Sequence, residues 1–67
     1  MRLRIEIELD NAAFGETNAE RIEEIARILN AWTALARRAP SLLSEVGVRL
    51  MDVNGNRVGS AYLERRM

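Results

Sequence analysis

The first ten residues alternate between apolar and polar side chains. One alternate set is apolar: Leu3, Ile5, Ile7 and Leu9. Because successive side chains of a β-strand point to opposite faces, this pattern predicts a strand with one buried and one solvated face. Asp10-Asn11 is a turn signal that ends the strand. Phe14, in the loop that follows, is expected to plug one end of the core.

A helical periodicity replaces the alternation in the next segment and predicts a helix from about Asn18 to about Arg38. Thr17 and Glu20 have the spacing of a capping box, in which each side chain bonds the backbone N–H of the other residue. Pro40 prevents simple continuation of the helix. The apolar stripe covers about half of the circumference, which is more than one sheet face needs. We expect the segment after Pro40, or a second copy of the chain, to cover the extra flank.

The stretch DVNGNRVG at 52–59 raises the question of a metal loop. Its polar residues have the spacing of the first three ligands of a calcium-binding loop: Asp52, Asn54 and Asn56. Such a loop needs Gly at its sixth position and Glu at its twelfth, and these positions hold Arg57 and Leu63. Apolar runs at 46–50 and 58–63 flank the stretch. The sequence therefore predicts a β-hairpin here and no metal site.

Two turns are compatible with this hairpin. A two-residue turn would consist of Asn54-Gly55 alone, whereas a three-residue loop, 53–55, would place Gly55 in a left-handed bulge position. We favour the three-residue loop because it collects more apolar side chains on one face. It predicts the pairs Leu50–Val58, Val48–Ser60 and Val46–Tyr62, and it turns Tyr62 inward.

The order strand, helix, strand, strand predicts a single α+β domain over residues 1–67. One helix is expected to pack on one face of a three-stranded antiparallel sheet, with the third strand in the middle. The alternative places the first strand beside the second, in parallel, through a right-handed crossover.

Composition narrows the chemistry. The chain has no Cys and no His, which excludes disulfides, thiolate or imidazole metal ligands, and imidazole catalysis. Ten basic residues, all Arg, balance ten acidic ones, and this argues against bulk attraction to nucleic acid or anionic lipid. No apolar run is long enough to cross a membrane, and the alternating start does not resemble a signal peptide. A cytoplasmic location is the expectation.

Carboxylates are the remaining candidates for catalysis. Glu6 and Glu8 share one face of the first strand about 7 Å apart, a separation found in glycosidases. Nothing in the sequence indicates a substrate cleft around them, and we interpret them as a solvated sheet face. We therefore predict no enzyme activity, no catalytic residue and no cofactor.

The outer sheet face is the candidate partner-binding surface. In the predicted register it presents Arg49, Met51, Arg57, Ala61 and Leu63, joined by Arg2 and Arg4. A mixture of Arg, Met and small apolar groups suits a protein contact. No aromatic residue is placed there to stack on bases, so a protein partner is favoured over nucleic acid. Trp32 is interpreted as a core anchor, or alternatively as an interface hot spot.

Three motifs carry a resemblance to a known group of proteins. With the alternating first strand, DNAAF at 10–14, ARIL at 26–29 and DVNGNRVG at 52–59, the chain resembles small uncharacterised proteins encoded in bacteriophages and prophages. The segment at 39–45 does not share the pattern. The resemblance implies an accessory viral protein that binds and blocks a host protein, as anti-CRISPR proteins do.

These observations define three hypotheses. The first is a non-enzymatic protein-interaction module, a phage-type inhibitor that occludes a surface of a bacterial defence or host complex. The second is a small nucleic-acid-binding or regulatory protein that uses its Arg residues. The third is a homodimeric structural protein whose seam is the wide helix stripe, with Ile28, Trp32 and Leu35.

Overall fold

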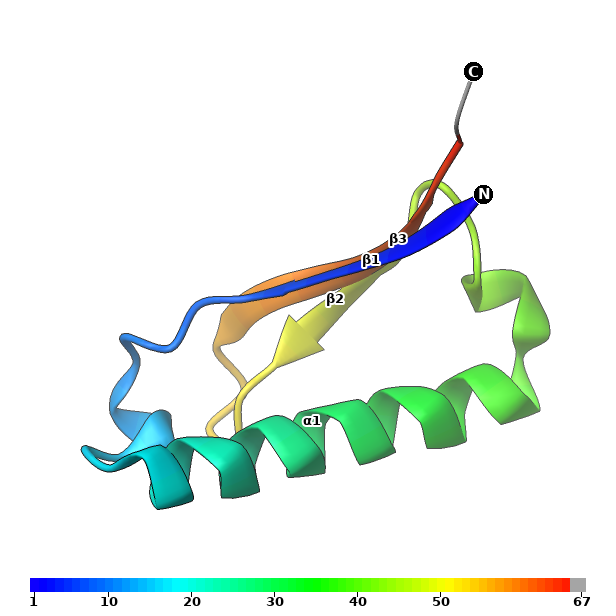
Figure 1. Cartoon of the computed structure of the whole chain (residues 1–67). Helices are drawn as coiled ribbons and strands as arrows, with labels where there is room; N and C mark the ends of the chain where they lie inside the picture. Colours follow the sequence, from blue (N-terminus) through cyan, green and yellow to red (C-terminus); the bar gives the residue numbers. More distant parts are fainter. Residues whose placement is uncertain (66–67) are drawn as a thin grey trace.

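The computed structural model describes residues 1–65 and shows one helix against one sheet (Figure 1). The strands are β1 (Arg2–Ile7), β2 (Val48–Met51) and β3 (Arg57–Glu64), and the helix is α1 (Asn18–Arg38). Two 3-10 helices flank α1: η1 (Ala12–Phe14) and η2 (Pro40–Leu42). The sheet is antiparallel with the order β1-β3-β2. The predicted α+β class, antiparallel sheet and central third strand are therefore confirmed.

Local chemistry sets the ends of α1. Thr17 Oγ1 accepts from the Glu20 N–H at 3.2 Å, and Glu20 Oε1 accepts from the Thr17 N–H at 3.1 Å. The predicted capping box is thus confirmed. The Thr17 hydroxyl also donates to Glu20 Oε1 at 3.0 Å, and this hydrogen bond is the largest cause that holds the pKa of Glu20 below its usual value. At the other end, Arg37 and Arg38 complement the helix dipole, and Pro40 begins η2.

The buried core is small and lies toward one end of the molecule. Its buried apolar residues are Phe14, Ile28, Leu50, Val58 and Ala61. Phe14 has no exposed surface, which confirms that it plugs the core. Figure 1 shows α1 and the sheet closest together near the β2–β3 turn and diverging toward the chain termini. The elements therefore enclose a closed core over only part of their length.

The turn of the hairpin agrees with the sequence prediction. The Gly55 N–H donates to Asp52 O at 3.0 Å, and Gly55 has φ +83°, the left-handed conformation of the predicted three-residue loop. Asp52 Oδ1 accepts from the N–H groups of Asn54 and Asn56 at 2.8 and 2.9 Å. Burial would raise the pKa of Asp52, but the hydrogen bonds from Asn56 and Asn54 outweigh it and lower that pKa. The prediction of a hairpin turn at 52–59 is confirmed.

The register beyond the turn differs from the prediction because β3 contains a bulge at Val58. Met51 pairs with Arg57, but Leu50 pairs with Gly59, so that Val58 is an extra residue on β3. Every later pair shifts by one residue, and Val48 faces Ala61 instead of Ser60. The predicted pairs of Leu50, Val48 and Val46 are therefore wrong. A shift of one residue reverses the face of each side chain.

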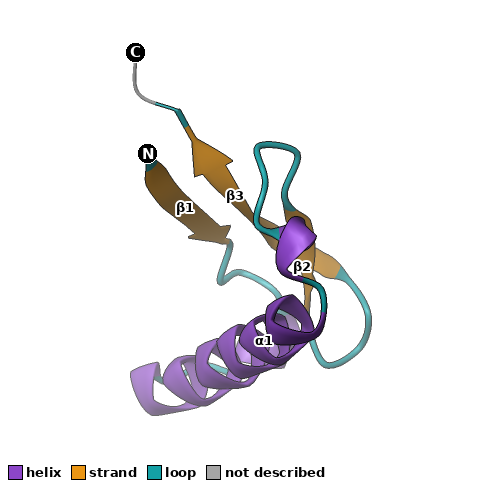
Figure 2. Ribbon diagram, turned by 90° about the vertical axis from the view of Figure 1, so that its right-hand side faces the viewer, coloured by secondary structure: helices purple, strands orange, loops and turns teal. Residues whose placement is uncertain are grey.

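The inner face of β1 is largely uncovered. Leu3 is 44% and Ile5 is 37% exposed, although both lie on the face of the sheet that α1 occupies. The buried cluster draws on β2 and β3, and only Ile7 of β1 packs against it. Figure 2 shows α1 nearer to β2 than to β1. The radius of gyration of 12.5 Å exceeds the value of about 11 Å for a compact chain of this length.

Candidate protein-binding groove

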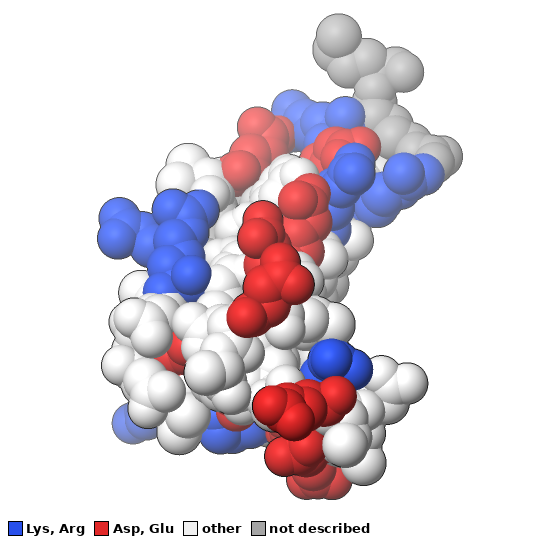
Figure 3. Space-filling model, turned by 90° about the vertical axis from the view of Figure 1, so that its left-hand side faces the viewer, with Lys and Arg blue, Asp and Glu red and all other residues white. Residues whose placement is uncertain are grey.

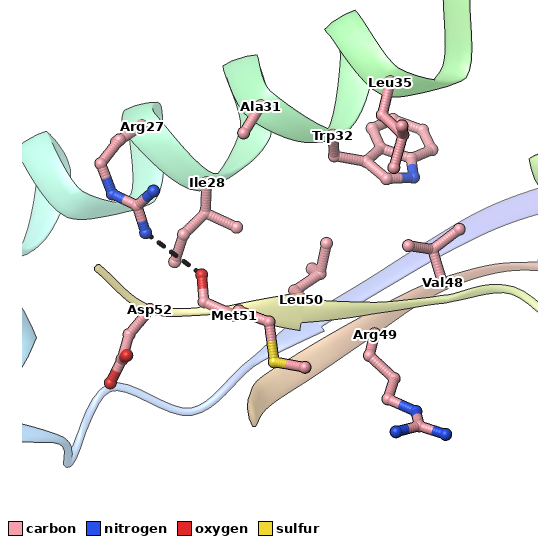
Figure 4. Close-up of a pocket in the computed structure, with 10 residues that line it drawn as sticks. All are labelled: Arg27, Ile28, Ala31, Trp32, Leu35, Val48, Arg49, Leu50, Met51 and Asp52. Atoms are coloured by element: carbon pink, nitrogen blue, oxygen red, sulfur yellow. Dashed lines mark hydrogen bonds between the residues drawn. The ribbon is translucent and has the colours of Figure 1, made fainter. Parts of the chain in front are cut away.

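A groove lies between one flank of α1 and the free edge of β2 (Figure 4). Its cavity has a volume of about 210 Å³. The apolar walls come from both elements: Ile28, Ala31, Trp32 and Leu35 of α1, and Val48 and Leu50 of β2. In Figure 4 the Val48 and Leu50 side chains point toward α1, whereas those of Arg49 and Met51 point away from it. We refer to this cavity as the α1–β2 groove.

The outer edge of β2 exposes backbone hydrogen-bonding groups along the open side of the groove. Met51 O accepts from Arg27 Nη2 at 3.1 Å, so this carbonyl points away from β3 and toward α1. Backbone groups of alternate residues in a strand point the same way, and those of Arg49 therefore also face the free edge. An edge with free N–H and C=O groups is a template for another strand. The groove thus combines apolar walls with backbone hydrogen-bonding groups.

An ion pair lies at one end of the α1–β2 groove, with a buried carboxylate on Glu24 and a guanidinium side chain on Arg27 that is 42% exposed. Glu24 is buried, and its Oε1 accepts from Arg27 Nε at 2.6 Å. Its Oε2 accepts from the Val53 N–H at 2.9 Å. The hydrogen bond from Arg27, with that from Val53, holds the pKa of Glu24 below its usual value, although burial opposes this. Through the Val53 N–H and Met51 O, the two side chains tie α1 to the hairpin at this end of the groove.

Trp32 lies at the other end. Its ring packs against the core, lines the α1–β2 groove and also lines a second apolar hollow of about 270 Å³ beside Ala36, Pro40 and Leu43. Within residues 1–65 its buried indole N–H has no hydrogen-bond partner. An unpaired buried donor costs about 1–3 kcal/mol. The interpretation of Trp32 as a core anchor is confirmed, and its hot-spot role stays a prediction.

The predicted outer-face residues are only partly gathered on that face. Arg49 and Met51 point away from α1 (Figure 4), and Arg4 forms ion pairs with Glu64 and Glu6 at 2.9 and 3.2 Å. Ala61 was predicted to be outside but is only 2% exposed and belongs to the core. It was misplaced because the bulge at Val58 reverses the faces of β3.

The same reversal places two further side chains of β3 on the face opposite to the predicted one. Leu63 shares the face of Ala61 and pairs with Leu3, so it lies on the inner side. Tyr62 lies outside, and its hydroxyl donates to Glu6 Oε1 at 3.1 Å. Burial and this carboxylate raise the pKa of Tyr62. Arg2 and Arg57 remain exposed as predicted, and Arg57 borders a polar hollow with Glu6 and Glu8.

The proposed seam residues do lie together, but on the wall of the groove. Ile28, Trp32 and Leu35 all line it (Figure 4). Ile28 is only 2% exposed because it packs on the sheet, whereas Leu35 is 48% exposed. The wide apolar stripe was the signal for this site. Its second wall was missed because it depends on where α1 docks relative to the edge strand β2, which the local sequence does not encode.

Acidic and basic side chains are mixed over the surface. In Figure 3 they adjoin near the top of the face drawn, which carries no continuous basic area. Among the described residues, no three acidic side chains come close enough to hold a metal ion. Over the same part of the chain, no helix combines the length and apolar character needed to span a membrane.

Comparison of the chain with protein-family models, curated proteins and solved structures gives no match. The fold and the groove therefore define it as a small α+β protein with an edge-strand groove. The resemblance to bacteriophage proteins stays an expectation from the sequence.

Proposed function

We propose that this chain is a non-enzymatic protein-interaction module that binds an extended segment of a partner in the α1–β2 groove. The bound segment adds to β2 as a further strand, a common mode of peptide recognition. The observation that carries this proposal is the free edge of β2 beside an apolar wall built around Trp32. Edge backbone groups supply affinity in this mode, and pockets for alternate side chains supply specificity.

The chemistry of β2 specifies the sequence of the bound segment. Side chains opposite Val48 and Leu50 enter the groove, so apolar residues are favoured at these positions. The side chain between them lies on the outer face beside Arg49, where a carboxylate is favoured over an ammonium group. The segment is therefore expected to read apolar, acidic, apolar.

A synthetic peptide tests this expectation. The probe is acetyl-Thr-Val-Glu-Leu-Thr-amide, and the matched control peptide carries Lys in place of Glu. Chemical-shift mapping on the isotope-labelled protein is expected to show movement of the Arg49 and Met51 amides and of the Trp32 indole N–H. Weaker movement is expected with the Lys peptide. Shifts confined to β1, or none at millimolar peptide, would contradict the proposal.

A pair of helix variants separates groove binding from general effects. Ala31 and Ala34 are both exposed on α1, but only Ala31 lines the groove. Ala31→Arg places a long charged side chain in the groove and is expected to weaken peptide binding at least tenfold. Ala34→Arg makes the same chemical change outside it and should bind as the parent chain does. Equal affinities for the two variants would count against the groove.

The finer proposal concerns the partner. The resemblance in the DNAAF, ARIL and DVNGNRVG motifs supports a phage-type inhibitor that acts by steric occlusion of a defence complex in the host bacterial cytoplasm. Expression in a bacterium with active CRISPR immunity is expected to restore plaque formation by a targeted phage. The Ala31→Arg variant should lose this effect and Ala34→Arg should keep it. Unchanged immunity in cells that express the protein well would contradict the inhibitor proposal. The proposal of peptide binding in the groove would still be decided by the peptide assay.

A further inference from the structure

β1 is the second free edge of the sheet. It bonds to β3 on one side only, because the strand order is β1-β3-β2. The Glu8 N–H donates to Val58 O at 2.8 Å, which shows that even-numbered residues turn their backbone groups toward β3. Alternation then places the N–H and C=O groups of Leu3, Ile5 and Ile7 at the outer edge. These groups are arranged to receive another strand.

The charges of β1 are self-complementary about Ile5. Counting outward from Ile5, Arg4 mirrors Glu6 and Arg2 mirrors Glu8. An antiparallel pair of two β1 strands with Ile5 opposite Ile5 therefore places each Arg opposite a Glu. Two neighbouring registers bond the same edge groups. The first pairs Leu3 with Ile5 and places Arg4 opposite Arg4, whereas the second pairs Ile5 with Ile7 and places Glu6 opposite Glu6. Like charges directly opposite each other are unfavourable, so the sequence selects the register centred on Ile5.

The apolar face of β1 fits the same register. Leu3 of one copy lies opposite Ile7 of the other, and these side chains join Ile5 on the inner face. A twofold axis normal to the sheet keeps both helices on that face. Leu29 and the exposed Ile22 lie on the flank of α1 opposite to the groove, and so on the β1 side. The two helices would then enclose the apolar strip that each chain leaves uncovered.

One chain exposes more surface than a folded monomer of its mass, and the excess is close to the area that a dimer interface would bury. Its accessible surface is 5109 Å², whereas a folded monomer of 7.6 kDa exposes about 4300 Å². The excess of about 800 Å² is close to the area that one partner buries in a stable interface of standard size. Leu3 and Ile5 of β1 are among the exposed large apolar side chains that such an interface would cover.

We propose that two copies of this chain pair antiparallel through β1, with Ile5 at the twofold axis, into one six-stranded sheet with three strands from each copy. Backbone hydrogen bonds of Leu3, Ile5 and Ile7 join the copies. Arg2–Glu8 and Arg4–Glu6 pairs fix the register on the outer face. This association uses the edge opposite to the α1–β2 groove and does not depend on the proposed peptide binding.

Charge reversal tests the register. Arg2 and Glu8 form no ion pair among residues 1–65, so their reversal leaves the described intrachain pairs intact. Light scattering across micromolar to millimolar concentrations is expected to give twice the chain mass of 7.6 kDa for the parent. Arg2→Glu and Glu8→Arg should each raise the dimer Kd about tenfold. The double variant should regain the dimer Kd of the parent. Arg49→Glu makes a charge change of the same size as Arg2→Glu, but on β2, and should leave the dimer Kd unchanged.

Cross-linking tests the axis itself. The chain contains no Cys, so Ile5→Cys introduces a single thiol. Directly opposed residues that share hydrogen bonds lie about 5.5 Å apart between Cα atoms, within the range of a disulfide. Mild oxidation is expected to give a covalent dimer. Leu3→Cys is the matched control, because the two copies of position 3 lie about 14 Å apart in this register and should not cross-link.

Three results would overturn the proposal. They are a monomer at all concentrations, a double variant no better than the singles, and equal cross-linking at positions 3 and 5. Circular dichroism of each variant separates these outcomes from loss of fold. If Ile5→Cys fails to fold, the charge-reversal series decides the register by itself.

Discussion

Glu24 Oε2 accepts a hydrogen bond from the Val53 N–H at 2.9 Å, and this contact ties the middle of α1 to the turn between β2 and β3. The residues are far apart in sequence, and the carboxylate also binds Arg27. Together with the hydrogen bond from Arg27 to Met51 O, this contact holds the helix against the hairpin.

Loss of this carboxylate is expected to destabilise the fold. Glu24→Ala should lower the free energy of unfolding by about 2 kcal/mol, because the Val53 N–H and Arg27 both lose their acceptor. Urea denaturation measures this value. Glu23→Ala, a change at the exposed neighbouring position, should shift stability by less than about 0.5 kcal/mol. Equal losses for the two variants would contradict the role of Glu24.

The pKa of Glu24 predicts how stability responds to acid. Its folded pKa lies below the usual 4.5, so its stabilising contribution is complete above the unfolded value and is lost as pH falls through the lower folded value. We therefore expect the free energy of unfolding to decline below about pH 4.5. Glu24→Gln should flatten this decline, leaving the part due to Asp52 and Glu20, whose pKa values are also lowered. An unchanged slope in the variant would refute the assignment.

Gly59 marks a close approach between β3 and β1. A Cβ added at Gly59 would meet the carbonyl oxygen of Glu6, which is backbone and cannot easily move. Gly59→Ala is therefore expected to cost about 2 kcal/mol or more in thermal or urea unfolding. Gly55→Asn is the comparison, since Gly55 has open space around it and Asn tolerates its φ of +83°. That variant should lose less than about 1 kcal/mol.

Because the buried indole N–H is unpaired, replacing Trp32 by Phe is expected to change the stability little. Trp32→Phe keeps an aromatic ring and removes a buried N–H that has no partner among residues 1–65. We expect its free energy of unfolding to stay within about 1 kcal/mol of the parent or to rise. Trp32→Ala should lose about 3 kcal/mol, because the ring packs against the core. A loss for Phe as large as that for Ala would show that the N–H is needed.

Features encoded by neighbouring residues could be predicted from sequence. The capping box of Thr17 and Glu20 and the left-handed turn residue Gly55 each depend on a few adjacent positions, and both are confirmed. The alternation over the first ten residues likewise predicted a strand, although the strand ends at Ile7 and the face expected to be buried is largely exposed at Leu3 and Ile5.

The bulge at Val58 could not be predicted in this way. The turn at 52–55 is the same with or without it, and only the packing of Val58 and Ala61 into the core distinguishes the two registers. The groove escaped prediction for a related reason. The apolar stripe through Ile28 and Leu35 was evident, but its second wall depends on where α1 docks relative to an edge strand.

The sheet order β1-β3-β2 has a consequence for valency. If β1 joins two copies, the edges of β2 become the two ends of a continuous sheet, separated by five strand spacings, or roughly 24 Å. Each assembly then offers two identical docking positions at a fixed span. A target that repeats its recognition segment at this span would be held by both at once, so that its apparent affinity exceeds that of either position alone.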